Sequence, residues 1–226
     1  MDTGTAKANK NGDLQTEITG LGIQDQHGGR MYKKQMKIQK IVCFLVLAAS
    51  VVVFLYSLGI MTDLYDSLYY TIPNKDNLDR SRVDGARVYY DMQPFNQQFL
   101  HFGIGLILCA VLLFLTNTNT RRRYYVSNII AVVVNAAVNV YVAVWAHAQI
   151  LAFKAQFLQV DFEALKKFAD RQHTLYTEST FWFDVHVAVF AFAIIANVLL
   201  IANMIWKFQL MKEEKQLIEA GKGAVA

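Results

Sequence analysis

The sequence predicts an all-α integral membrane protein. Its four transmembrane helices form two hairpins, with both termini cytoplasmic and the third helix extended beyond the membrane on the outer side. The composition is 54% hydrophobic, above the roughly 45–50% of soluble domains. Four stretches contain no Asp, Glu, Lys or Arg: residues 41–62, 95–120, 124–153 and 185–206. Each is long enough to cross a hydrocarbon core about 30 Å thick, which takes about 20 residues of helix.

The distribution of charge predicts the orientation of the chain. Cytoplasmic segments of membrane proteins carry an excess of Lys and Arg close to the spans. Here the N-terminal segment, the short connection between the second and third spans and the C-terminal segment together have a net charge of +7, whereas the two longer connections have −3. We therefore expect both termini in the cytoplasm and the longer connections outside, most simply in a plasma (inner) membrane.

These observations divide the chain into nine segments. The cytoplasmic segments are an N-terminal tail, a short basic turn and a C-terminal tail, at 1–40, 117–126 and 207–226. The transmembrane helices are 41–62, 95–116, 127–153 and 181–206. The outer segments are a loop at 63–94 and an amphipathic helix extension with its loop at 154–180. Residues 1–30 are polar and have no hydrophobic period, so we expect them to form a flexible tail.

The third helix is expected to continue past the membrane without a break. No Pro or Gly interrupts the chain from Ser127 to Arg171, and apolar residues recur beyond residue 153 on roughly one helical face. Such an amphipathic pattern predicts one continuous helix over this whole range. Its outer end could lie along the membrane, or pack on the first outer loop or on a partner, and the sequence leaves these arrangements open.

The third span carries a ridge of small and polar residues at every fourth position. In lipid, small residues let helix backbones approach closely, and Asn side chains form hydrogen bonds between helices. A step of four residues drifts about 40° around a helix of 3.6 residues per turn, so the ridge winds across the surface. We expect helix packing from Ser127, Ala131, Asn135, Asn139 and Ala143. A polar path for a solute is the alternative, although the predicted spans contain no Asp, Glu, Lys or Arg apart from Asp184.

Three histidines and one aspartate lie near the outer ends of the predicted spans: His101, His147, Asp184 and His186. Imidazole and carboxylate groups bind Zn, Cu and Fe, and paired His can bind haem axially. Interfacial positions without any bound group explain the same residues, because no two of them share one helix at i, i+4 spacing. We expect no cofactor, and a metal ion or haem at the outer face is the alternative.

Several kinds of chemistry are excluded by the sequence. Cys43 and Cys109 both lie in predicted spans, so neither can staple an outer loop. The chain has no Cys-x-x-Cys unit, P-loop, Gly-x-Ser-x-Gly or His-Glu-x-x-His. We therefore predict no catalytic residue.

The basic excess predicts contact with the membrane surface rather than with nucleic acid. Arg121, Arg122 and Arg123 occupy the cytoplasmic turn with no acidic neighbour. Anionic lipid headgroups, worth about 1 kcal/mol per Lys or Arg near the surface, or an acidic partner would meet them there.

Together these features favour a non-catalytic subunit or accessory protein of a larger membrane complex, such as a transporter, channel or respiratory-type assembly. It would act through helix packing and outer-loop contacts with other membrane subunits, in a homo- or hetero-oligomer. One alternative is a metal- or haem-dependent membrane redox enzyme that uses the outer His/Asp residues. The other is a small, self-sufficient channel or transporter.

Overall fold

The computed structural model describes residues 5–62, 83–118, 125–172 and 176–223. Regular structure in these ranges is helical throughout: α1 Thr5–Met61, α4 Val88–Asp91, α5 Gln93–Asn117, α6 Tyr125–Phe157, α7 Phe162–Gln172 and α8 Phe181–Gly223. Four segments are long and apolar enough to cross a membrane: Lys33–Met61, Val88–Asn117, Val126–Phe157 and Phe181–Glu213. The prediction of an all-helical chain with four helices of spanning length is confirmed.

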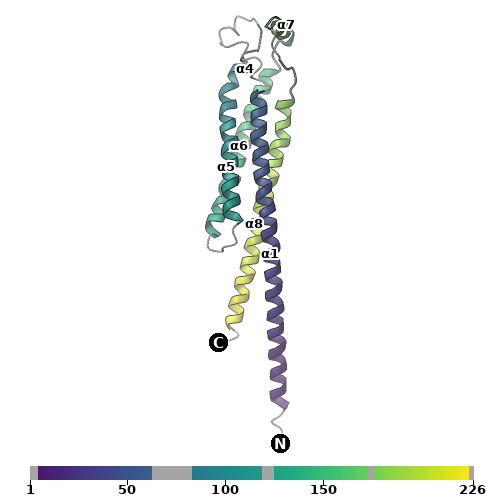
Figure 1. Ribbon diagram of the computed structural model, residues 1–226, viewed down its shortest axis with the longest axis vertical. Helices are drawn as coiled ribbons and strands as arrows, with labels where there is room; N and C mark the ends of the chain where they lie inside the picture. The colour runs from purple at the N-terminus through teal and green to yellow at the C-terminus, as the bar shows by residue number, and fades with distance from the viewer. Residues whose placement is uncertain (1–4, 63–82, 119–124, 173–175, 224–226) are drawn as a thin grey trace.

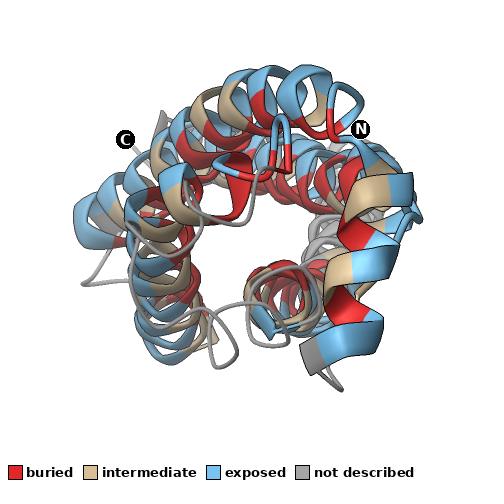
Figure 2. Ribbon diagram, turned by 90° about the horizontal axis from the view of Figure 1, so that it is seen from above, coloured by how far each residue is buried: buried red, intermediate tan, exposed pale blue. Residues whose placement is uncertain are grey.

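The four long helices form an up-down-up-down bundle (Figure 1). α1 packs against α5 and α8, and α6 packs against the same two helices. Both termini lie at one end of the molecule, and α4 and α7 lie at the other (Figure 1). Viewed along the bundle, the buried residues face inward and the exposed residues face outward (Figure 2).

The buried face of α1 follows the alternating three- and four-residue spacing that lets side chains of neighbouring helices interlock. Its members are Gln39, Val42, Val46, Ala49, Val53, Tyr56 and Ile60. The outward face is also apolar, since Ile41, Phe44 and Leu55 are each more than half exposed. The other three long helices likewise expose large apolar side chains. An apolar exterior of this extent fits contact with lipid in a bilayer.

The predicted continuous helix from Ser127 to Arg171 is wrong. α6 ends at Phe157, and α7 begins at Phe162 after a short turn. Asp161 caps the new helix, because its Oδ1 accepts a hydrogen bond from the backbone N–H of Ala164 at 3.0 Å, and Asp is a favoured N-cap residue. The expected amphipathic pattern survives in α7, where Leu165 and Ala169 are buried.

Part of the first outer loop holds the turn in place. The backbone N–H of Asp161 donates to the carbonyl oxygen of Asp84 at 3.0 Å. Gly85 has a φ of 77° and lies directly against Gln159 and Val160. This left-handed conformation is one that glycine adopts without a steric cost. Residues 159–161 therefore pack on the described end of the predicted first outer loop, which is one of the arrangements that the sequence left open.

The expected flexible tail at the N-terminus is also contradicted, because α1 begins at Thr5. With 57 residues, α1 is about 85 Å long, and it projects past the end of α5 and α6 (Figure 1). Once a spanning segment has nucleated a helix, each further residue adds a hydrogen bond while only that residue is fixed.

α8 continues to Gly223 through the predicted C-terminal tail. The predicted basic turn with Arg121, Arg122 and Arg123 lies mostly outside the described residues.

Candidate functional site

Polar side chains lie inside the bundle at several levels, and two groups of them lie toward its two ends. At the end that carries the termini lies the amide layer, which we define as Gln35, Gln39, Asn117 and Asn203, all buried. Toward the other end lies the histidine pair, His147 and His186. Each group contains residues from different helices that are far apart in the sequence, and the antiparallel packing of the helices brings them together.

The amide layer joins three helices through the side chain of Gln39. The Nε2 of Gln39 donates to Asn117 Oδ1 on α5 at 3.5 Å. Its Oε1 accepts from Gln35 Nε2 at 3.3 Å and from Asn203 Nδ2 on α8. Because α1, α5 and α8 each contribute a side chain, these bonds fix the heights of the three helices relative to one another.

Lys207 adds a positive charge near this layer. It is only 5% exposed, and no described carboxylate forms an ion pair with it. Lys207, which the sequence assigned to the C-terminal tail, lies within the long apolar segment Phe181–Glu213. Lys207 continues the buried spacing of α8 after Leu200 and Met204, and its long aliphatic stem packs like an apolar side chain.

A second set of amides joins α6 to α8 nearer the middle of the bundle. Asn135 Nδ2 donates to Asn197 Oδ1 at 2.9 Å. Asn139 differs, because its Nδ2 donates to the backbone oxygen of Asn135 in its own helix at 2.9 Å. Asn197 also donates to its own helix, at Ala193 O. The hydrogen bond from Asn135 is therefore the one among these that crosses between helices.

The ridge predicted on the third span is buried only in its central part. Asn135, Asn139 and Ala143 are buried, Ala131 is half-buried and Ser127 is exposed. The buried stripe instead alternates steps of four and three residues: Asn128, Val132, Asn135, Asn139, Val142 and Ala146. A row of residues spaced four apart drifts about 40° around the helix at each step, so both ends of the row turn away from the bundle axis.

Aromatic rings fill the core between the two polar levels. The ring of Phe99 lies 5.6–6.4 Å, centroid to centroid, from those of Tyr56, Phe95, Trp145 and Phe190. Phe99 itself is fully buried, and Tyr56 and Phe190 are nearly so. The four rings come from all four long helices of the bundle, so this layer joins every helix to the others.

The histidine pair bridges α6 and α8. His147 Nδ1 lies 2.8 Å from His186 Nε2, and His186 Nδ1 lies 2.5 Å from the backbone oxygen of Phe183. A carbonyl oxygen can only accept, so Nδ1 of His186 carries the proton, and Nε2 of neutral His186 presents its lone pair to His147. His186 is buried, whereas His147 is exposed.

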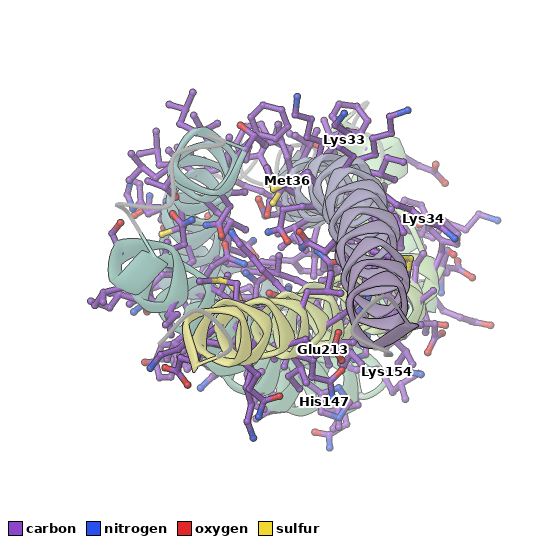
Figure 3. All side chains as sticks on the ribbon, turned by 90° about the horizontal axis from the view of Figure 1, so that it is seen from below. Lys33, Lys34, Met36, His147, Lys154 and Glu213 are labelled. Atoms are coloured by element: carbon purple, nitrogen blue, oxygen red, sulfur yellow. The ribbon has the colours of Figure 1, made fainter. Side chains whose placement is uncertain are left out.

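An ion pair lies beyond the histidine pair on the same two helices. Lys154 Nζ contacts Asp184 Oδ1 at 2.5 Å, and the Thr180 hydroxyl donates to Asp184 Oδ2 at 2.8 Å. His147 and Lys154, seven residues apart, lie on the same side of the bundle (Figure 3). Both carboxylate oxygens of Asp184 are thereby used by neighbours other than a histidine.

The four residues proposed from sequence as metal ligands are only partly brought together. His147 and His186 are in contact, Asp184 pairs with Lys154, and His101 is exposed on α5. Within the described ranges, no three His, Cys, Asp or Glu side chains are close enough to hold a metal ion.

Sequence reasoning missed the amide layer and the partner of Asp184. A signal for the first was present, because Gln35 and Gln39 continue the buried spacing of Val42 and Val46 toward the N-terminus. Lys154 had no such signal, since its pairing depends on how α6 and α8 are aligned. Near the amide layer, at the end of the bundle that carries the termini, Lys33 and Lys34 point outward from α1 (Figure 3).

Comparison of the chain with protein-family models, with curated proteins and with solved structures gives no match.

Proposed function

We propose that this protein is a non-catalytic, multi-pass subunit or accessory protein of a larger membrane complex, such as a transporter, channel or respiratory-type assembly. It works by contact with other subunits, not by a reaction of its own. The observation that carries this proposal is the aromatic layer around Phe99, where rings from all four long helices touch inside the bundle. A solute crossing the bundle would have to separate these rings.

The surfaces available for contact support the same proposal. α5 and α6 expose apolar side chains along their outward faces, among them Leu108, Leu112, Val133 and Val144. Lipid tails are as apolar as these side chains, so such faces can contact either lipid or a helix of another subunit. At the ends of the bundle, the projecting part of α1 and the outer segment with α7 offer surfaces to soluble domains. Arg121–Arg123 would meet anionic headgroups or an acidic partner at the cytoplasmic face.

Photo-crosslinking in the native membrane tests this proposal. A photoreactive amino acid is placed at exposed positions on α5 and α6, for example Leu108, Leu112, Val133 and Val144, one at a time. The matched control is Leu106, which lies on α5 but is buried. We expect defined protein adducts from one face of the bundle and none from Leu106. Adducts with lipid alone at every exposed position would contradict the proposal.

A second candidate, a small channel or transporter, is favoured by the buried Lys207. An ionisable side chain inside a membrane bundle commonly marks an ion or substrate pathway. Reconstitution in liposomes separates the two functions, with Lys207→Met compared with wild type. Ion or solute flux that Lys207→Met abolishes would support the channel. The subunit proposal predicts no flux from either protein.

A further inference from the structure

In the histidine pair, both ring nitrogens of His186 have a partner, and this fixes the direction in which its Nε2 points. Nε2 of His186 is aimed at His147 because Nδ1 of the same ring is anchored on the carbonyl oxygen of Phe183. Histidines that bind metals almost always have their second ring nitrogen donating to a carbonyl or carboxylate in this way, which fixes the tautomer and the direction of the lone pair. One imidazole is thus already oriented as a metal ligand.

We infer that His147 and His186 form a binding site for a divalent transition-metal ion, such as Zn²⁺, which bridges α6 and α8. The ion would lie between His147 Nδ1 and His186 Nε2, where the Nδ1 proton of His147 now lies. That proton moves to Nε2 of His147, so the ring stays neutral and only its tautomer changes. Imidazole nitrogen suits Zn, Cu, Fe and Ni, so the site selects transition metals rather than Ca²⁺ or Mg²⁺.

The distances allow this exchange with a small movement. Zn–N bonds of about 2.0–2.1 Å at a tetrahedral centre place two ligand nitrogens about 3.3–3.4 Å apart. The observed separation of 2.8 Å must therefore open by about 0.5 Å. His147 is exposed, so its ring can move outward by this amount without disturbing the core around His186.

The neighbouring charges define the rest of the coordination. Asp184 and Lys154 are the charged groups nearest the pair on α8 and α6, and they neutralise each other at 2.5 Å. Thr180 holds the second carboxylate oxygen of Asp184. The protein thus supplies two imidazoles, and water completes the coordination on the exposed side of His147.

Zinc titration of the purified full-length protein tests the inference. The protein in mild detergent is stripped of metal with a chelator and titrated with ZnCl₂ by calorimetry. The variants are His147→Gln and His186→Gln. The matched control is His101→Gln, which removes an exposed histidine from α5, away from the pair. Circular dichroism and gel filtration establish that each variant is folded. If the variant at the buried His186 does not fold, the test still rests on His147→Gln, which replaces an exposed ring and should therefore fold.

We expect one Zn²⁺ per chain in wild type and in His101→Gln. Losing a hydrogen-bond partner of a metal ligand weakens metal binding roughly 10–100-fold. His147→Gln removes a ligand itself, so it should weaken zinc binding by more than this. As a second readout, electron paramagnetic resonance of bound Cu²⁺ should show coupling to two imidazole nitrogens in wild type and to fewer in His147→Gln. Equal zinc affinity in wild type and His147→Gln would overturn the inference, as would an equal loss in His101→Gln.

Discussion

At the scale of single residues, the hydrogen bond between the side chains of Asn135 and Asn197 joins α6 to α8 in the middle of the bundle. A double-mutant cycle with Asn135→Ala and Asn197→Ala measures it, because each substitution removes one partner of the 2.9 Å bond. We predict a coupling free energy of about 0.6 kcal/mol and no more than about 1.7 kcal/mol, the average and the largest values found for hydrogen bonds between membrane helices. The measurement is reversible unfolding in mixed micelles.

Asn139 provides the control for this cycle. Its side chain donates to the backbone of its own helix, so Asn139→Ala combined with Asn197→Ala should show a coupling close to zero. Equal coupling in the two cycles would mean that Asn135 and Asn197 do not share a specific bond.

At the same scale, the limit of prediction from sequence is visible in the ridge of the third span. The residue types of Asn135, Asn139 and Ala143 were sufficient to place them among candidates for helix packing, and all three are buried. Ser127 has a similar residue type but is exposed. What distinguishes them is which side of α6 each residue occupies, and that depends on how α6 lies against its neighbours.

At the scale of elements, the bend between α6 and α7 depends on Gly85. A Cβ atom there would lie 2.7 Å from the backbone oxygen of Gln159, and the φ of 77° is one that side chains such as Ala rarely adopt. We predict that Gly85→Ala destabilises the protein by about 1–3 kcal/mol, the usual cost of a residue held in a strained backbone conformation. Hydrogen exchange at 158–161 should increase in the same variant, because the contact with the turn is weakened.

Gly105→Ala is the matched control for this prediction. Nothing lies within 4 Å of a Cβ atom built at Gly105, and Ala is favoured over Gly inside a helix by about 0.5–1 kcal/mol. This variant should be neutral or slightly more stable. If Gly85→Ala behaved in the same way, the packing of the first outer loop on the turn would be refuted.

The four spanning helices were predictable because a bilayer imposes a length and a composition that can be counted in the sequence. The bend after Phe157 was not, although Asp161 is a residue type that often begins a helix. The bend also depends on the hydrogen bond from the backbone N–H of Asp161 to the carbonyl oxygen of Asp84, a residue far away in the sequence. Local patterns show where a helix can continue, whereas contacts of this kind determine where it stops.

At the scale of the whole molecule, the charge asymmetry predicts both termini in the cytoplasm. Single cysteines are introduced at Asn77 and Gln172, and separately at Thr118 and Gly221, in a background without Cys43 and Cys109. We predict that a membrane-impermeant thiol reagent labels the first two positions in intact cells. The second two should react only after the membrane is opened. The reverse pattern would show that the chain is inserted the other way round.

The candidate site was predictable only in part at this scale. The sequence placed His101, His147 and His186 at a similar depth but could not determine which helices are neighbours. The bundle order puts α6 beside α8, which joins His147 to His186 and leaves His101 apart. The same order creates the amide layer, whose members come from three helices and share no motif.

The central claim is that this protein acts as one part of a larger membrane assembly, and native mass spectrometry of protein released gently from its own membrane tests it most directly. The chain alone has a mass of 25.7 kDa. We predict a species of larger, defined mass in which this chain is bound to other subunits or to further copies of itself at fixed stoichiometry. A single chain of 25.7 kDa that carries a catalytic activity of its own would contradict the account.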